Sequence, residues 1–257
     1  MTEEARALRI KTLEISYAGH DGNLMSCFSS ADIISSLYHS VIDPFDRSGD
    51  RNQFVLSKGQ SNMALIAQLV LCGAIPEEEI QTACRLESRI SMQADRTKIG
   101  CIENSAGSLG HGLPIAAGMA WAKKIRGNTG KVFVLVGDGE MNEGTMWEAC
   151  LFAASEKLDN LVIIIDNNHS LDEMLNIGSF KDKMEAFGLE YMSVNGHDDS
   201  EITRALNAPH ERPLAIDAQT VRGWGSKTML ADRFWFHRAP NEEQLRVLTE
   251  EVKTFAG

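Results

Sequence analysis

Two short stretches in which every residue is apolar constrain the fold of this 257-residue chain more than any other feature. They read VFVLV over 132–136 and LVIII over 161–165. A strand is apolar at every position when protein covers both faces of its sheet, which is the usual state of a parallel sheet. We therefore expect both stretches to be strands of a parallel sheet with helices on its two faces.

From residue 131 onward the sequence alternates between strand-like and helix-like segments. This alternation is typical of a doubly wound α/β fold, in which each helix returns the chain to the same edge of the sheet. The predicted strands lie at 132–136, 161–166, 190–194 and 214–220. The predicted helices between them lie at about 143–157, 180–187 and 199–206.

The first half of the chain adds helices and one further strand. We predict helices over 2–18 and 29–42, with Ser30 at the start of the second because serine favours helix N-termini. The elements expected after them are a strand over 54–56, a loop over 57–60, a helix ending near residue 73, a loop-rich stretch and a helix over 115–125. No segment resembles a linker, so we predict a single α/β domain over residues 1–257.

The composition argues against several classes of protein. A formal net charge of −11 opposes attraction to nucleic acid and to anionic membranes, because both carry negative charge. No apolar run approaches the roughly 20 residues that a membrane-spanning helix needs, and the start MTEEARALRIK is too charged for a signal peptide. We therefore expect a cytoplasmic protein that binds neither nucleic acid nor membranes. The five cysteines show no CxxC spacing, so we expect reduced thiols and no structural zinc.

A glycine-rich turn follows the first of the two apolar strands. Gly137, Asp138 and Gly139 come directly after the apolar run. At the carboxyl ends of strands in a doubly wound sheet, glycines permit tight turns and free N–H groups bind anions, so a phosphate is favoured there. Asp138 would repel a phosphate, and a bridging cation removes that conflict. Mg²⁺ is the expected ion because it prefers oxygen ligands shared between protein and phosphate.

The second apolar strand ends in Asn167 and Asn168. The spacing 168 − 138 = 30 residues accommodates one helix and one strand, which returns the chain to the sheet edge beside Asp138. The Asn168 amide oxygen and a carbonyl from the following loop then join the Asp138 carboxylate around one ion. The alternative is that Asp138 and Asn168 are ordinary turn residues, which GDG alone would favour. The pairing of GDG with NN at this spacing favours the metal site.

Five separated motifs resemble, in order, those of the thiamine-diphosphate-binding part of the transketolase family. They are AGHDGN, FVLSKGQ, SAGSLGHGLPIAAGMA, GDGEMNEG…WEA…LDNLVIIIDNN and TVRGWGS…FHRAPN. The length matches only the N-terminal, diphosphate-binding part of a transketolase. The resemblance therefore implies one subunit of a split, two-subunit transketolase, with the absent pyrimidine-binding domain on a partner chain. An α2β2 assembly is expected because each cofactor site in this family is shared across an interface.

The resemblance implies ligands for thiamine diphosphate and Mg²⁺. The side chains of Asp138 and Asn168 and the backbone carbonyl of Ser170 are the implied metal ligands. Gly139 is the implied N–H donor to the diphosphate. The other implied cofactor-binding residues are Gly107 and Leu109, at the aminopyrimidine, together with Glu140, Gln60 and His237.

The resemblance also implies catalytic residues for two-carbon ketol transfer. His20 and His237 match histidines that face the substrate, and Glu143 and Glu148 match interface carboxylates that link paired cofactors. Five residues turn a helix by about 500°, so these glutamates would stand about 140° apart and are not an acid–base pair. In the implied reaction the thiazolium ring adds to a ketose carbonyl. It then holds the electrons of the broken carbon–carbon bond until an aldehyde acceptor arrives.

Two departures from the family pattern fall on site positions. LSKGQ places Gln60 where the family has a histidine near the diphosphate, and MQADRTKIGCIE places Gln93 where it has a histidine near the reacting carbons. Glutamine forms hydrogen bonds but carries no proton near neutral pH, so acid–base roles at both positions are lost. Two other functions stay open: the α-type half of a 2-oxo-acid decarboxylase or dehydrogenase, and a non-catalytic cofactor-binding or regulatory paralogue.

Overall fold

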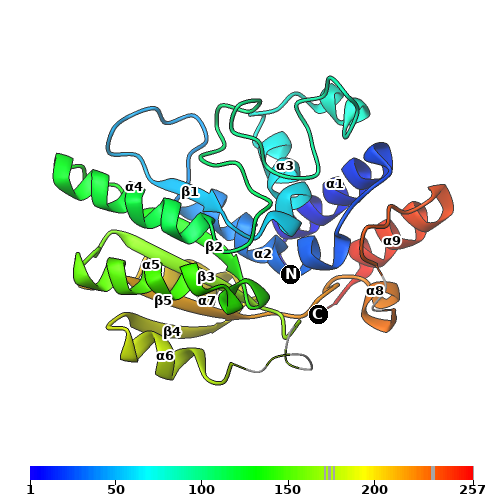
Figure 1. The fold of residues 1–257 in the computed structure, drawn as a ribbon. Helices are drawn as coiled ribbons and strands as arrows, with labels where there is room; N and C mark the ends of the chain where they lie inside the picture. Colours follow the sequence, from blue (N-terminus) through cyan, green and yellow to red (C-terminus); the bar gives the residue numbers. More distant parts are fainter. Residues whose placement is uncertain (171, 173–174, 176, 233–234, 257) are drawn as a thin grey trace.

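Five parallel strands form one sheet in the part of the chain that the computed structural model describes, residues 1–170, 172, 175, 177–232 and 235–256 (Figure 1). The strands follow the order β1-β2-β3-β5-β4 across the sheet. Their bounds are β1 (Gln53–Leu56), β2 (Val132–Gly137), β3 (Leu161–Asn167), β4 (Glu190–Asn195) and β5 (Leu214–Gln219). Neighbouring strands are parallel throughout, so their carboxyl ends meet at one edge.

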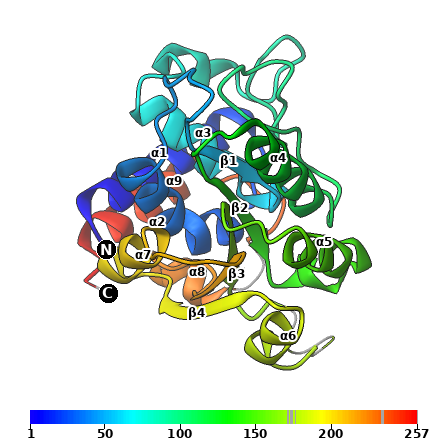
Figure 2. The same cartoon turned by 90° about the vertical axis from the view of Figure 1, so that its left-hand side faces the viewer.

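Helices cover both faces of this sheet, which confirms the predicted doubly wound α/β architecture (Figure 2). One layer contains α1 (Glu3–Gly19), α2 (Leu24–Ser40), α3 (Asn62–Leu71), α7 (Asp199–Leu206) and α9 (Glu242–Thr254). The other layer contains α4 (Gly112–Arg126), α5 (Gly144–Ser155) and α6 (Phe180–Ala186). Shorter helices are η1 (Gly59–Ser61), η2 (Glu77–Thr82), η3 (Gly139–Asn142) and α8 (Lys227–Ala231).

The two faces of the strands build two separate hydrophobic clusters. Phe133 and Leu135 of β2 pack with the α1 layer, whereas Val134 and Val136 of the same strand pack with α4 and α5. Every residue of β2 and β3 is buried, as expected for strands that are apolar at each position. All the strands expected from the sequence form, and the pairing of Gly137 with Asp166 places the ends of β2 and β3 side by side.

The predicted start of the second helix is wrong. Helix α2 begins at Leu24, with Asn23 at its N-cap position, and Ser30 lies inside it with 0% of its surface exposed. The Ser30 hydroxyl donates to the carbonyl oxygen of Ser26 at 2.9 Å. Serine in a buried helix is satisfied by such a bond to the preceding turn, so its preference for helix starts did not decide its place here.

A buried ion pair joins α1 and α2 to the segment after β5. The side chains of Arg9 and Asp32 are 0% and 3% exposed and lie 2.5 Å apart. Arg9 also donates to the carbonyl oxygens of Phe28 and Trp224, both at 2.9 Å. His197 Nδ1 lies 2.7 Å from the Asp32 carboxylate. Burial by itself would raise the pKa of Asp32, but Arg9 and His197 together lower it to about 2.

The remaining composition-based expectations concern membranes and thiols. No helix within the described ranges combines the length and apolar character needed to cross a bilayer. All five cysteines are free. Burial raises the pKa of Cys27 and of Cys150 to about 12, so both are protonated, while Cys72, Cys84 and Cys101 are partly exposed.

Replacing one partner of the Arg9–Asp32 pair should destabilise the fold strongly. Arg9→Met leaves the Asp32 charge buried without its cation, and we expect the free energy of unfolding in urea to fall by about 3–5 kcal/mol. Lys124→Met is the matched control, because Lys124 pairs with Asp159 on the surface, and should cost about 1 kcal/mol or less. Equal effects of the two substitutions would contradict the structural role given to Arg9.

Candidate functional site

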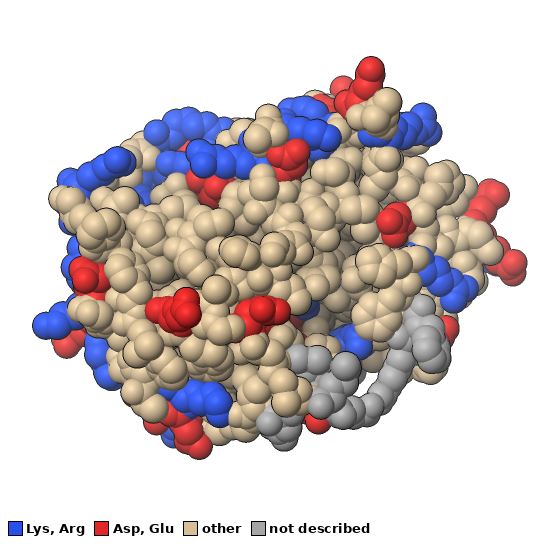
Figure 3. Space-filling model, in the orientation of Figure 1, with Lys and Arg blue, Asp and Glu red and all other residues tan. Residues whose placement is uncertain are grey.

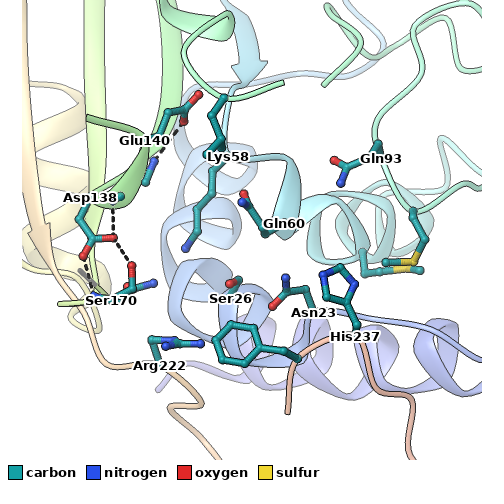
Figure 4. Close-up of a pocket in the computed structure, with 17 residues that line it drawn as sticks. Asn23, Ser26, Lys58, Gln60, Gln93, Asp138, Glu140, Ser170, Arg222 and His237 are labelled. Carbon is teal, nitrogen blue, oxygen red and sulfur yellow. Dashed lines mark hydrogen bonds between the residues drawn. The ribbon is translucent and has the colours of Figure 1, made fainter. Parts of the chain in front are cut away.

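A cavity of about 510 Å³ opens at the sheet edge where β1, β2 and β3 end (Figure 4). Its wall includes the start of α2, the turn after β1, the turns after β2 and β3, and parts of the segment 222–237. Asp138 and Ser170 lie on one side of it, Gln93 and His237 on the other, and Lys58 between them (Figure 4). The carboxyl ends of parallel strands are the usual place for ligands in such a sheet.

Asp138 is fixed by the turn that follows the neighbouring strand. Its Oδ1 accepts hydrogen bonds from Gly139 N and Ser170 Oγ, both at 2.8 Å, and its Oδ2 accepts one from Ser170 N at 2.7 Å. The residue is 6% exposed and lines the cavity. Ser170 therefore contacts Asp138 through its N–H and hydroxyl groups, while the expected role of its backbone carbonyl as a metal ligand stays a prediction.

Asn168 presents an unused oxygen to the same cavity. Its Nδ2 donates to Ser29 Oγ at 3.1 Å, while its Oδ1 is buried and has no hydrogen-bond partner among the described residues. An unpaired buried acceptor costs free energy, and a bound cation would remove that cost. A carboxylate, an amide oxygen and no soft donor form a ligand set that suits Mg²⁺. The described residues hold no group of three or more His, Cys, Asp or Glu able to bind a metal, so the ion would need further ligands from a bound molecule.

Behind this edge lies a buried polar network centred on Asp166 of β3. Lys58, which follows β1, forms an ion pair with Asp166, and the two side chains are 6% and 0% exposed. Ser29 Oγ donates to Asp166 Oδ2 at 2.7 Å, Lys58 Nζ donates to Ser29 Oγ at 3.1 Å, and Thr220 donates to Asp166 Oδ1. The network thus connects α2 and the ends of β1, β3 and β5 to the Ser29 hydroxyl that holds Asn168.

Glu140 has its carboxylate occupied by the protein itself. Oε1 accepts hydrogen bonds from the hydroxyl of Ser57 and from Gly110 N at 2.9 Å, and Oε2 accepts one from Gly137 N at 3.3 Å. Burial raises the pKa of Glu140 against the lowering effect of these bonds. Its observed contacts hold the loop before α4 against the ends of β1 and β2, although the residue also lines the cavity.

The structure brings most of the sequence-predicted residues together but leaves four of them outside the cavity wall. The predicted residues in the wall are Gln60, Gln93, Leu109, Asp138, Gly139, Glu140, Asn168, Ser170 and His237. Those outside it are Gly107, His20, Glu143 and Glu148. Gly107 lies directly behind the wall, because a Cβ on Gly59 would be 3.2 Å from Gly107 N and 2.2 Å from Gln93 Oε1.

The other three outlying residues are exposed. His20 caps the end of α1 with a positive φ of 53°. Glu148 lies in α5, whereas Glu143 is the N-cap residue of that helix, with extended φ and ψ values of −75° and 133°, so α5 begins within one residue of the start predicted at about 143. The helical angle expected between Glu143 and Glu148 therefore does not apply.

Sequence reasoning missed four polar residues of the wall: Asn23, Ser26, Lys58 and Arg222. Asn23, Lys58 and Arg222 each lie in one of the five motifs, which were the available signal, whereas Ser26 lies outside them. Arg222 has its guanidinium carbon 4.1 Å from the ring centroid of Phe236, which also lines the cavity. Arg222 and a cation at Asp138 would give this cavity the positive charge that a diphosphate requires, because Lys58 is already paired with Asp166.

Comparison with known proteins agrees with this geometry. The family described as "Transketolase, thiamine diphosphate binding domain" matches residues 1–249. One of the relatives is a subunit of the apulose-4-phosphate transketolase of Actinobacillus succinogenes. It is 33% identical over 267 residues, which cover 98% of this chain and 96% of that protein. The protein of the same name from Phocaeicola vulgatus is 32% identical over 258 residues, covering 95% and 90% of the two chains.

A solved transketolase has the same fold as this chain. The transketolase of Campylobacter jejuni superposes with a TM-score of 0.89 and 29% sequence identity. The match covers 98% of this chain and 42% of the Campylobacter chain, so this chain spans less than half of that transketolase.

Proposed function

The chain belongs to the transketolase family, and from that premise we propose that it is the cofactor-binding subunit of a two-subunit enzyme that transfers a two-carbon ketol unit from a ketose to an aldehyde. The observation that carries the proposal is the site at the ends of β2 and β3. There Asp138 and Ser170 are joined by hydrogen bonds, and Asn168 offers an unpaired oxygen to the same cavity. These groups fit Mg²⁺ and the diphosphate of thiamine diphosphate.

We assign residues of this chain to the metal ion, to the diphosphate and to part of the organic portion of the cofactor. Asp138 and Asn168 would bind the metal ion with their side-chain oxygens, and Ser170 would complete the protein ligands with its carbonyl. Gly139 would donate its N–H to the diphosphate. Arg222 would offset the remaining negative charge, while Leu109 would contact the organic part.

Thiamine diphosphate supplies, when bound, a carbon centre that accepts and returns the electrons of the broken carbon–carbon bond. Around it, the chain's residues bind the substrate and move protons. His237 is the one histidine in the described part of the cavity wall, and histidine is the side chain that most often transfers protons in enzymes. We assign it the transfer of a proton to and from a substrate hydroxyl.

Gln60 and Gln93 would hold their ligands by hydrogen bonds alone. A carboxamide donates and accepts hydrogen bonds but does not exchange protons near neutral pH. Proton transfer in this cavity would therefore depend on His237, on His20 if the assembled complex brings it near, and on groups of the partner chain.

The proposal requires a second chain. The Campylobacter transketolase contains more than the part that this chain matches, and two relatives of similar length are named as subunits. We propose that the partner supplies the pyrimidine-binding domain and that the two chains form an α2β2 complex, because such cofactors bind between domains. Glu143 and Glu148, both exposed at α5, would then lie at an interface between subunits.

An apolar face beside the cavity is the proposed contact surface for this partner. Figure 3 shows few charged side chains over α4 and α5. The exposed apolar residues of these helices and of the loop before them are Leu109, Ile115, Trp121, Ile125, Leu151 and Phe152. Leu109 also lines the cavity, so a chain that closes the cavity from this side would cover the face as well.

Cofactor binding by the assembled complex tests the proposed function. Calorimetry should detect thiamine diphosphate binding that is lost when EDTA removes the divalent ion. Asn168→Ala removes one metal ligand and should weaken cofactor binding on the order of 10–100-fold. Loss of a residue that only supports a metal ligand already has an effect of this size.

Asn160→Ala is the matched control for this experiment. Asn160 also has a buried Oδ1 without a partner among the described residues, but it lies outside the cavity wall. Its substitution should leave cofactor affinity unchanged. Binding that does not respond to EDTA or to Asn168→Ala would contradict the proposal, and comparison of ketoses with 2-oxo acids as donors would distinguish it from a 2-oxo-acid decarboxylase.

The partner surface gives a separate prediction. Leu151 is 56% exposed in α5, so Leu151→Glu should leave the isolated chain folded but place an unpaired charge in the proposed interface. We expect the affinity of the two chains, measured by analytical ultracentrifugation, to fall about tenfold or more. Val247→Glu, at a 39% exposed position of α9 on the other side of the sheet, should have no such effect. Equal affinities for the two variants would place the partner elsewhere.

A further inference from the structure

Asn23 occupies a helix-capping position, yet its side chain does not cap the helix. Asparagine is favoured at N-caps because its side-chain oxygen accepts an N–H of the first turn. At the start of α2, Asn23 has φ −116° and ψ 62° and makes no such hydrogen bond. Asn241, in contrast, caps α9 through reciprocal hydrogen bonds with Gln244. Helix α2 therefore lacks a stabilising interaction that its own sequence could supply.

The Asn23 side chain is directed into the cavity instead. It lines the cavity wall, and the residue is 6% exposed. Its Oδ1 is buried and has no hydrogen-bond partner among the described residues. Figure 4 shows Asn23 near His237, on the side of the cavity away from Asp138 and Ser170. A buried acceptor without a donor is unfavourable in the free protein, and a ligand that donates a hydrogen bond relieves this cost.

Gln93, on the same side of the cavity, also has a side-chain oxygen without a hydrogen-bond partner among the described residues. This oxygen is Oε1, and it is buried. Space for this oxygen depends on Gly59, because a Cβ at position 59 would lie 2.2 Å from it. Two carboxamides thus present unused hydrogen-bonding capacity to one region, and each offers an acceptor and two donors.

This region of the cavity carries no fixed charge from the described residues. The two acidic residues of the wall, Asp138 and Glu140, lie on the opposite side, and Arg222 lies on that side as well (Figure 4). The Lys58 ammonium group is paired with Asp166. A neutral ligand that both donates and accepts hydrogen bonds fits here. The hydroxyl groups of a sugar have this property.

We propose that Asn23, supported by Gln93, recognises hydroxyl groups of the ketose donor and sets the specificity of the site. This inference rests on the proposed function and extends it. Because the metal ion and the diphosphate take the Asp138 side, the groups near Asn23 belong to the substrate. An amide at position 23 selects a donor that has a hydroxyl group there, since a donor without one leaves the amide unpaired.

Kinetics of the assembled complex, loaded with thiamine diphosphate and Mg²⁺, test this proposal. Asn23→Ala should raise KM for the ketose donor about tenfold, with a smaller change in kcat, because it removes a hydrogen bond to bound substrate. Deoxy analogues of the donor should react poorly with the wild-type protein. For one of these analogues, the Asn23→Ala enzyme should be no less active than the wild-type enzyme. The hydroxyl that this analogue lacks is then the one that Asn23 contacts.

Two controls separate recognition from folding and from cofactor binding. Asn241→Ala removes a real helix cap and should lower the melting temperature without changing KM, whereas Asn23→Ala should leave the melting temperature and the calorimetric cofactor affinity unchanged. An unchanged KM with no coupling to any deoxy analogue would overturn the proposal, as would a loss of cofactor affinity in Asn23→Ala. Absence of cofactor binding by the wild-type complex would instead refute the proposed function itself.

Discussion

The buried ion pair between Lys58 and Asp166 is the interaction on which the site depends. Burying either charge alone would cost several kcal/mol, so each requires the other, together with hydrogen bonds that satisfy the remaining polar atoms. Ser29 and Thr220 provide those hydrogen bonds to the Asp166 carboxylate. Because the four residues come from α2 and from the ends of β1, β3 and β5, satisfying one carboxylate fixes the relative positions of four elements.

This network also determines which polar atoms and charges of the cavity are left unpaired for a ligand to bind. Ser29 accepts a hydrogen bond from the Asn168 amide group, which leaves the Asn168 oxygen unpaired beside the cavity. Lys58 neutralises Asp166, so Asp138 is left as the uncompensated charge at the tip of β2. A divalent cation there would exceed the charge of Asp138 by one unit and so attract a diphosphate. The polar core and the proposed metal site are consequently parts of one arrangement.

The sequence predicted the central sheet and the meeting of Asp138 and Asn168 at one edge of it, because both follow from local patterns. Fully apolar strands and the spacing between Asp138 and Asn168 report directly on a parallel sheet with its ends at one edge. The polar network was not predictable in this way, since Lys58 and Asp166 are 108 residues apart and nothing local indicates their pairing. The wrong start of α2 has a similar cause: Ser30 is satisfied inside a buried helix, and only the packed structure reveals this.

The role of a residue was harder to predict than its place in the cavity. Glu140 lines the cavity, as a residue expected to contact the cofactor should, and its carboxylate binds Ser57 and backbone N–H groups, so the cofactor contact itself stays a prediction. His20 and the two glutamates of the α5 region are exposed in the single chain, because no described part of this chain covers them. Their roles stay predictions that depend on the proposed partner chain, which sequence motifs of one chain indicate only through resemblance.

The central claim is that Asp138 and Asn168 bind one divalent ion together with a diphosphate. A crystal structure of the assembled complex with thiamine diphosphate and Mn²⁺ in place of Mg²⁺, with anomalous diffraction to locate the metal, tests it most directly. The account predicts a single anomalous peak about 2.0–2.3 Å from an Asp138 carboxylate oxygen and from Asn168 Oδ1, with diphosphate oxygens in the same coordination shell. An ion bound elsewhere, or a bound diphosphate with no metal between it and these two side chains, would contradict it.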